Sequence, residues 1–168
     1  MQEILKRVLM KLWREKRKMN MNRKEEIYLQ SRCPCPMCSG TRIDNKLIDW
    51  ILNYEKKTGL KINITSGARC ESYNREIDGY WESPHLIDAL NTGHAIDFQI
   101  EGMKPIEVAF KVNNTGLSRI GIYPNHVHGD MFKPKPSKYW YVKTYNSTPI
   151  YSKEEKDLKK FLKVNNGL

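Results

Sequence analysis

The four histidines of the chain all lie between positions 85 and 128, and two of them fall in the run His126-Val127-His128-Gly129-Asp130. Residues two apart on a β-strand point to the same face, so His126, His128 and Asp130 share a face if this segment is extended. Two imidazoles and a carboxylate on one face are costly to bury unless they are paired or bind a cation. The spacing therefore indicates a paired or cation-binding cluster.

The segment HAIDFQI (94–100) carries a second histidine and a carboxylate, and its alternation predicts a strand. The same two-residue period places Asp97 with Ala95 and Gln99, whereas His94 falls on the other, more apolar face. We therefore expect that Asp97 and His94 do not serve one ion. His94 is the first candidate for a structural or surface histidine.

Three ordered blocks resemble the zinc D-alanyl-D-alanine carboxypeptidases, a family whose fold is shared with hedgehog signalling domains. The blocks are TSGARCESYNREI (65–77), Ser83-Pro84-His85 followed by Gly93-His94-Ala95-Ile96-Asp97, and GIYPNHVHGD (121–130). The middle block is similar to the family signature S-x-H-x-x-G-x-A-x-D, and Tyr139-Trp140 resembles its aromatic close. The resemblance spans residues 30 to 142.

The resemblance implies a peptidase that acts on peptidoglycan stem peptides or crosslinks, with Zn2+ bound by His85, Asp97 and His128. It further implies that His126 steadies the developing oxyanion and that Arg69 grips a substrate carboxylate. Two imidazoles and one carboxylate leave a fourth position for water, as in catalytic zinc sites. Zinc lowers the pKa of such a water to about 7 and polarises the scissile carbonyl.

Two departures from the family pattern concern the site. LIDALNT separates His85 from Gly93 where the pattern has two residues, so this loop carries five extra residues. Asn125 stands where some relatives have an acidic general base, and an amide cannot accept a proton at neutral pH. Asp130 is our first substitute, although it is equally placed to orient a ligand imidazole.

Asp88 and Glu82 are weaker candidates for the base. The alternative function is a catalytically silent binding or structural module of the same fold, for example a phage particle component, and Asn125 favours it.

The elements expected around these residues define an α+β domain with a small, mainly antiparallel sheet flanked by helices. Asp44 caps a predicted helix that Gly59 ends, and a second helix is predicted at Pro105–Val112. The remaining elements are a strand at 61–65, a short helix at 71–77, and strands within 94–100, 118–123, 126–131 and 138–143.

The two ends of the chain are predicted to lie outside this domain, which we place at 30–145. Residues 2–17 have the pattern of a basic amphipathic helix, which contacts a membrane or packs on the domain or on another subunit. The polar segment that follows, to Glu26, is interpreted as a linker, so that 1–29 form one region. Ser152 and Glu155 form a capping-box pattern, and we expect a C-terminal amphipathic helix within 146–168.

Three of the four cysteines crowd into CPCPMC at Cys33, Cys35 and Cys38, and Cys70 lies far along the chain. This spacing is compatible with a structural metal, with a disulfide, or with ordinary reduced thiols. We expect the cysteines to serve structure rather than chemistry, because none lies within the histidine-bearing blocks.

The chain has 29 Lys and Arg against 19 Asp and Glu, a formal charge of +10, which favours an anionic partner. It contains no recognised nucleic-acid-binding motif, so no specific nucleic acid is expected. No stretch approaches ~20 apolar residues, and the N-terminal segment lacks the pattern of an export signal. A cytoplasmic or phage-associated protein is therefore expected.

Overall fold

The computed structural model describes residue 6 and residues 21–38, 40–132, 138–144, 147–152 and 154. The predicted helix at 2–17, apart from Lys6, and the apolar residues of the predicted C-terminal helix lie outside these ranges. The elements are α2 (Arg23–Ser31), β1 (Arg42–Ile43), α3 (Asn45–Thr58), β2 (Ile62–Ser66), α4 (Glu71–Glu76), β3 (Thr92–Gly93), β4 (Ala95–Ile100), α5 (Pro105–Val112), β5 (Arg119–Ile122), β6 (Val127–Asp130), β7 (Tyr139–Tyr141) and β8 (Ile150–Ser152).

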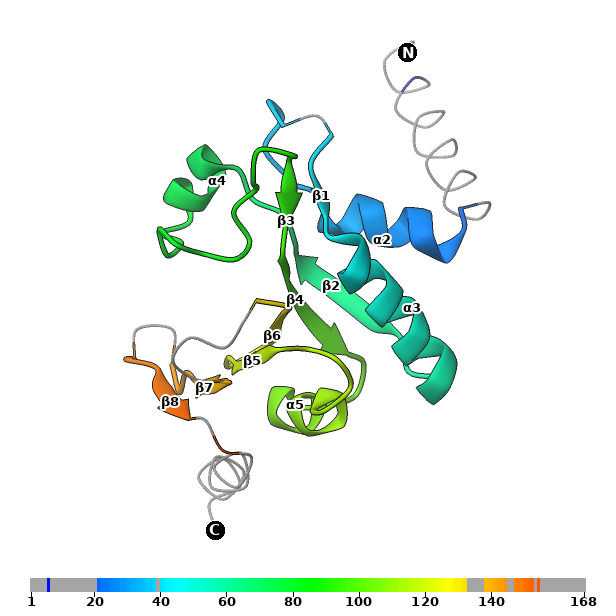
Figure 1. The fold of residues 1–168 in the computed structure, drawn as a ribbon, viewed down its shortest axis with the longest axis vertical. Helices are drawn as coiled ribbons and strands as arrows, with labels where there is room; N and C mark the ends of the chain where they lie inside the picture. The colour runs from blue at the N-terminus through cyan, green and yellow to red at the C-terminus, as the bar shows by residue number, and fades with distance from the viewer. Residues whose placement is uncertain are drawn as a thin grey trace.

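A sheet with the strand order β2-β4-β6-β5-β7-β8 forms the centre of the molecule (Figure 1). All neighbouring strands are antiparallel except β5 and β7, which run parallel. The short strands β1 and β3 pair separately, in parallel. The predicted α+β fold with a mainly antiparallel sheet is confirmed.

Helix α3 begins and ends where the sequence predicts. The Asp44 side chain accepts a hydrogen bond from the Lys46 amide at the N-terminus, and Gly59 adopts a left-handed conformation with φ of 72° at the C-terminus. Its apolar face is buried, and the Trp50 ring lies edge-on to Phe98 of β4 at 5.7 Å. Helix α5 contributes Val108 to the same core.

The two faces of β4 have different surroundings. Ile96 and Phe98 are fully buried in the hydrophobic core with the helices, whereas Asp97 points to the opposite face because side chains alternate along a strand. In β6, which pairs with β4, Val127 belongs to the core and His128 lies opposite Asp97. The polar residues of both strands therefore share the face away from α3.

Helix α2 was not predicted, and the interpretation of the segment to Glu26 as a linker is wrong from Arg23 onward. Asn22 caps this helix in a capping box with Glu25. Only Ile27 and Ser31 of α2 are buried, so its apolar periodicity is too sparse to predict a helix from the sequence. Strand β8 and the two-residue strands β1 and β3 were also missed.

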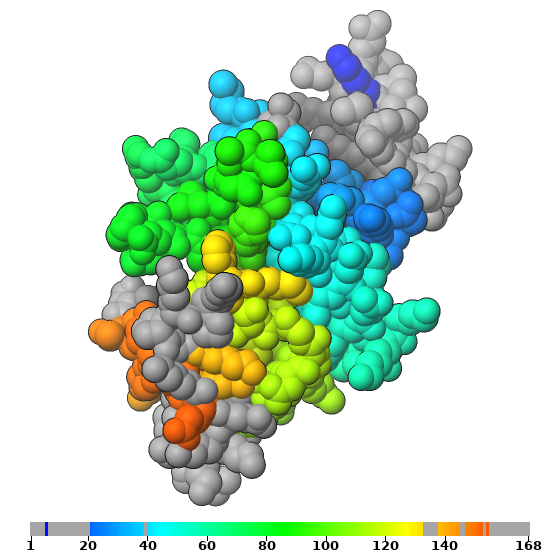
Figure 2. Space-filling model, viewed as in Figure 1, coloured from blue at the N-terminus to red at the C-terminus, as the bar shows by residue number. Residues whose placement is uncertain are grey.

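The segment from α4 to β3 and the strands β7 and β8 lie on one side of the molecule, with α3 on the other (Figure 2). The loop that precedes His85 exposes Tyr80 and Trp81, whose side chains are 63% and 73% accessible. No helix in the described part of the chain is long and apolar enough to cross a membrane.

Candidate metal centre

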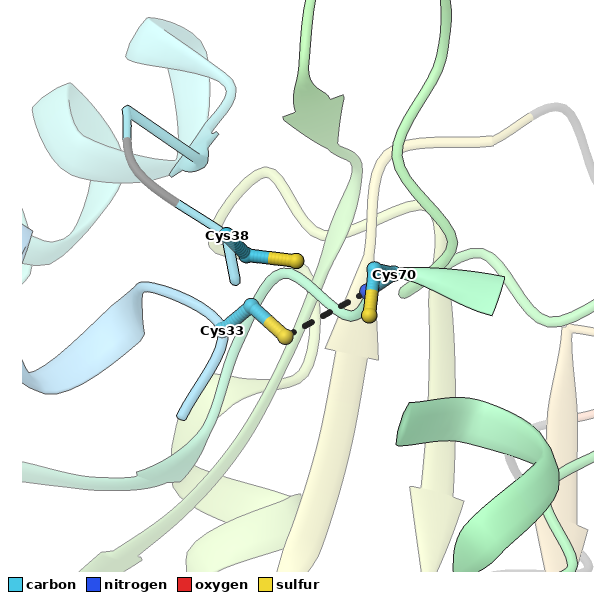
Figure 3. A group of neighbouring side chains, drawn as sticks. All are labelled: Cys33, Cys38 and Cys70. Carbon is cyan, nitrogen blue, oxygen red and sulfur yellow. Dashed lines mark hydrogen bonds between the residues drawn. The ribbon is translucent and has the colours of Figure 1, made fainter. Parts of the chain in front are cut away.

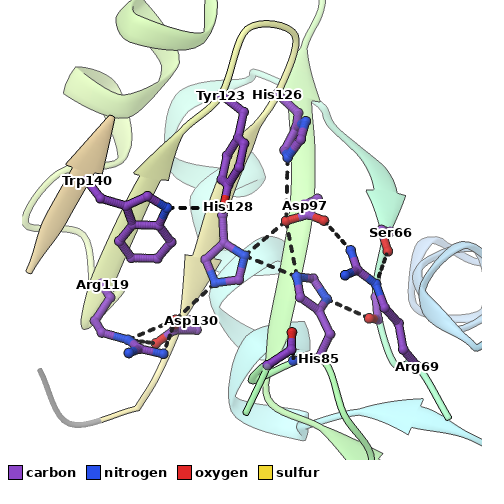
Figure 4. Close-up of polar contacts among 12 residues, drawn as sticks. Ser66, Arg69, His85, Asp97, Arg119, Tyr123, His126, His128, Asp130 and Trp140 are labelled. Carbon is purple, nitrogen blue, oxygen red and sulfur yellow. Dashed lines mark hydrogen bonds and ion pairs between the residues drawn. The ribbon is translucent and has the colours of Figure 1, made fainter. Parts of the chain in front are cut away.

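His85, Asp97 and His128 meet on the polar face of the sheet, and all three are buried (Figure 4). Asp97 Oδ1 lies 3.1 Å from His85 Nε2 and 3.0 Å from His128 Nδ1, and the two ring nitrogens are 3.0 Å apart. Ligand atoms of a tetrahedral zinc ion lie about 3.3 Å apart when each bond is about 2.0 Å. The three atoms therefore have nearly the spacing of zinc ligands.

The other nitrogen of each imidazole already has an acceptor. His85 Nδ1 lies 2.7 Å from the carbonyl oxygen of Gly67, and His128 Nε2 lies 3.0 Å from Asp130 Oδ2. An oxygen of this kind takes the N–H of a neutral ring and leaves the lone pair on the opposite nitrogen. Two lone pairs and a carboxylate oxygen then converge within about 3 Å. A cation relieves the resulting repulsion, so these residues fit a bound metal ion.

His85 is positioned by backbone contacts, despite the insertion that follows it. Its carbonyl accepts a hydrogen bond from the Arg69 amide at 2.8 Å, and the Ile87 amide donates to the Arg69 carbonyl at 3.0 Å. Beyond the insertion, the His94 amide donates to Pro84 at 2.8 Å. A Cβ on Gly93 would lie 2.8 Å from the His85 carbonyl oxygen, so only glycine allows this approach.

The insertion closes on itself as a small loop at the surface. Asp88 Oδ1 accepts hydrogen bonds from the amides of Leu90 and Thr92. The His94 ring lies between two carboxylates, with Nδ1 3.3 Å from Asp44 and Nε2 3.2 Å from Asp88. His94 thus joins the loop to the start of α3, and the prediction of a structural histidine agrees with these contacts.

Asp130 lies on the far side of His128 from the cluster and is fully buried. Arg119 faces it across β5 and β6 and donates from Nε to both carboxylate oxygens, at 2.9 and 3.0 Å. Of the two roles that the sequence left open for Asp130, these contacts fit the orientation of His128. Arg119 was missed because it is identified only by its strand pairing with Asp130.

Arg69 contacts the cluster through the outer oxygen of Asp97. Its Nη2 lies 2.6 Å from Asp97 Oδ2, and its Nε donates to Ser66 Oγ at 3.0 Å. One contribution of Arg69 is therefore to hold the Asp97 carboxylate with Oδ1 toward the histidines. The role of the Gly67 carbonyl was also missed, because a backbone acceptor has no signature in the sequence.

His126 lies beside the three residues without joining them. Its Nε2 is 3.8 Å from Asp97 Oδ1, and its ring stacks on Tyr123 at 4.6 Å. Nδ1 lies 2.7 Å from Asn125 Oδ1. Because an amide oxygen only accepts, Nδ1 carries the proton and the Nε2 atom of the neutral ring presents a lone pair toward the cluster.

Trp140 covers the side of the site that lies over β5. Its ring packs 5.1 Å from His128, and its Nε1 donates to the Tyr123 hydroxyl at 3.1 Å. A Cβ on Gly121 would lie 2.3 Å from the indole, so this glycine makes room for Trp140.

The pKa values of the cluster reflect burial and mutual charge. Burial opposes ionisation of Asp97, yet His85 and His128 hold its pKa well below the ordinary value. Burial lowers the pKa of both His85 and His126, although the charge of Asp97 acts in the opposite direction. For His128, hydrogen bonds to Asp130 and Asp97 outweigh burial and raise the pKa. Asp97 is therefore ionised and keeps its ligand form.

A cavity of about 580 Å³ opens next to His126. It lies by the β4–α5 turn and includes the amide side chains of Asn63, Gln99 and Asn125. Gln99 donates to the Asn125 carbonyl at 2.6 Å. None of the three clustered residues lines this cavity, which meets the site only through His126.

Helices flank a mostly antiparallel sheet that carries a His-Asp-His cluster on one face, and three such ligands with an open fourth position are typical of catalytic zinc sites. The family model Peptidase M15 matches residues 20–130, and the chain belongs to this family of zinc D-alanyl-D-alanine carboxypeptidase-like peptidases. No curated protein and no solved structure matches the chain. The family is zinc-dependent, and His85, Asp97 and His128 are its candidate metal site here.

Proposed function

We propose that the protein is a zinc-dependent peptidase that hydrolyses peptide bonds of peptidoglycan stem peptides or crosslinks, and that His85, Asp97 and His128 hold the zinc. The observation that carries this proposal is the pair of outer contacts on the histidines. Gly67 and Asp130 occupy the remote nitrogens, which leaves His85 Nε2 and His128 Nδ1 to face Asp97 Oδ1. Such remote acceptors fix the tautomer and the orientation of metal-binding histidines.

Bound zinc would polarise the scissile carbonyl and lower the pKa of the attacking water. We assign the proton transfer to His126, whose Nε2 faces the cluster and whose Nδ1 donates to Asn125. Nε2 accepts the proton of the water as the C–O bond forms and, as part of an imidazolium, donates a hydrogen bond to the developing oxyanion; the same proton then passes to the leaving amine as the C–N bond breaks. The His126 ring therefore serves as the general base, a role that the amide of Asn125 cannot fill, and it also makes the expected contact with the oxyanion.

Two of the three candidate carboxylate bases, Asp130 and Asp88, are engaged elsewhere. Asp130 is buried between Arg119 and His128, and Asp88 binds His94 and closes its own loop. Both side chains would have to give up these contacts to accept a proton at the metal. This favours His126 over either residue.

Arg69 is the proposed contact for a substrate carboxylate. Its Nε and Nη2 hold Ser66 and Asp97, and Nη1 has no hydrogen-bond partner among the described residues. A guanidinium nitrogen free to donate beside the cluster suits a terminal carboxylate or a stem-peptide carboxylate. The excess of basic residues favours an anionic wall polymer as the substrate.

The test is digestion of isolated peptidoglycan by the purified full chain, with the released fragments identified by mass spectrometry. We expect cleavage that stops on treatment with a chelator and returns on addition of Zn2+. His128→Ala should be inactive, whereas His94→Ala, which removes a histidine of the loop contact, should stay active. If the zinc-loaded wild type cleaves no stem peptide or crosslink, the peptidase proposal is wrong for this substrate class.

Asn125 favours one other function, the catalytically silent module of the same fold. In that case the zinc-loaded wild type would bind peptidoglycan in a sedimentation assay and release nothing. A gain of cleavage in Asn125→Asp would then identify the missing carboxylate as the cause.

A further inference from the structure

Three cysteines from distant parts of the sequence meet between the end of α2 and the start of α4 (Figure 3). Cys33 follows α2, Cys38 lies in the next loop, and Cys70 is the N-cap of α4. Their three sulfur atoms lie within 4.8 Å of one another, and no disulfide joins them. Cys33 is buried and the other two are partly buried.

The fourth cysteine, Cys35, lies next to this cluster along the chain. Cys35 and Cys38 are the ends of a tight turn, in which the Cys38 amide donates to the Cys35 carbonyl at 3.0 Å. Hydrogen bonding to Cys70, burial, and contacts with the thiols of Cys35 and Cys33 raise the pKa of Cys38 to about 12. The turn places Cys35 beside Cys38, so its thiolate can complete a ligand set with the three clustered sulfurs.

Backbone amides already point at two of the sulfur atoms. The Cys70 amide donates to Cys33 Sγ at 3.4 Å, and the Tyr73 amide donates to Cys70 Sγ at 3.3 Å. The contact with the Tyr73 amide lowers the pKa of Cys70 and so favours its thiolate, which is the form that binds metals. The Cys33 amide is in turn fixed by Thr41 Oγ1 at 2.9 Å.

We propose that Cys33, Cys35, Cys38 and Cys70 bind a second zinc ion, which is structural and separate from the peptidase centre. Three clustered thiolates, with Cys35 of the adjoining turn as the fourth, make up the ligand set of a closed tetrahedral zinc site. A disulfide would use two of the four sulfurs and leave the other two beside it. Four free thiols would gather oxidisable groups at a partly exposed site.

The position of the cluster indicates what this zinc does. Cys70 directly follows the turn that serves the peptidase centre, where the Gly67 carbonyl binds His85 and Arg69 binds Asp97. The Ala68 amide in the same turn donates to the Ser31 carbonyl at the end of α2. Zinc at the four cysteines would fasten this turn to the 31–41 segment and so keep the acceptor of His85 in place.

The test is metal analysis of the full chain, purified under reducing conditions with zinc present. We expect about two zinc ions per chain in the wild type and about one in each of His128→Ala and Cys38→Ser. The double variant should hold close to none. A wild type with a single zinc that His128→Ala abolishes would overturn the proposal.

A second measurement avoids variants of the cysteines, because Cys38→Ser can reduce the folded fraction. X-ray absorption at the zinc edge of His128→Ala should show sulfur as the only ligand type. A Co2+-substituted sample of the same variant should show thiolate-to-metal charge-transfer absorption. Nitrogen or oxygen ligands at the remaining zinc, or an intact disulfide found by mass spectrometry after alkylation, would contradict the four-thiolate site. A spectrum that shows iron bound by the same thiolates would overturn the assignment of the metal as zinc.

Discussion

Asp97 on β4 and His128 on β6 are register partners, and their Oδ1 and Nδ1 atoms lie 3.0 Å apart. Neighbouring antiparallel strands hold opposite residues at a fixed separation, so backbone pairing alone positions two of the three proposed ligands. His85 is different, because it lies in a loop and is not paired to Asp97 or His128 through the sheet. The accuracy of the site therefore depends on the contacts of His85 with the 67–69 turn.

The proposed ligands differ from His94 in their effect on zinc. Replacing His85 or His128 with Ala should abolish tight zinc retention at this centre, because two remaining protein ligands do not complete a tetrahedral site. His94→Ala should leave zinc content nearly unchanged, since the His94 side chain contacts Asp44, Asp88 and Phe132 rather than the cluster. Zinc content measured on the folded protein checks this. Equal losses in all three variants would contradict the assignment of ligands.

Asp130→Asn should weaken zinc binding about 10–100-fold without removing a ligand, because it takes the charged acceptor away from His128 Nε2. The same change leaves Arg119 without its carboxylate, so a lower melting temperature is expected as well. Competition with a chelator of known affinity measures the zinc effect. Asp88→Asn is the control, and it should leave zinc affinity unaltered. Loss of turnover with unchanged affinity in Asp130→Asn would instead favour Asp130 as the base.

His126→Gln should lower kcat by ~10²–10⁴ while zinc is retained, if Nε2 transfers the proton. Asn125→Ala should have a smaller effect, because it removes only the acceptor that orients the ring. Steady-state kinetics on a defined peptidoglycan fragment, together with zinc analysis, separates catalysis from metal loss. Turnover of His126→Gln close to that of wild type would show that another group moves the proton.

Arg23 anchors α2 to the rest of the domain. Its Nη2 donates to Glu55 and to the Ile62 carbonyl, both at 2.6 Å, and its Nε reaches Glu55 at 2.9 Å. Arg23→Met should therefore lower the free energy of unfolding by about 2–3 kcal/mol, since partly buried charged hydrogen bonds are lost. Lys24→Met, at the exposed neighbouring position, should change it by less than about 0.5 kcal/mol. Chemical denaturation compares the two, and equal effects would argue against this anchor.

The parts of the fold that the sequence predicts are those with strong local signals. Asp44 and Gly59 bracket α3 because a capping carboxylate and a left-handed glycine act within one turn of the helix. Alternation along β4 separates Asp97 from His94, and the structure places them in different surroundings. Helix α2 was not predicted, because the contact between Arg23 and Glu55 that holds it joins residues 32 positions apart in the sequence.

In the candidate site, the proposed metal ligands are predictable from the sequence, whereas the groups that orient them are not. The resemblance to the zinc carboxypeptidase family selects His85, Asp97 and His128, whereas strand alternation alone places His126, His128 and Asp130 on one face. The groups that orient them are a backbone carbonyl at Gly67 and an arginine at Arg119, and only three-dimensional pairing reveals either. The cysteine cluster is predictable only in part. The sequence shows the motif at Cys33–Cys38, but only the structure shows that Cys70 lies beside it.

The loop between His85 and Gly93 is pinned at both ends and closed by Asp88 in the middle. The orientation of His85 therefore does not depend on the length of this loop. Lengthening a surface loop also costs little free energy. A search signature with a fixed spacing between the first histidine and the glycine would overlook such chains. The exposed tip at Leu90 is also a position where a foreign peptide or an affinity tag should be accommodated without moving His85.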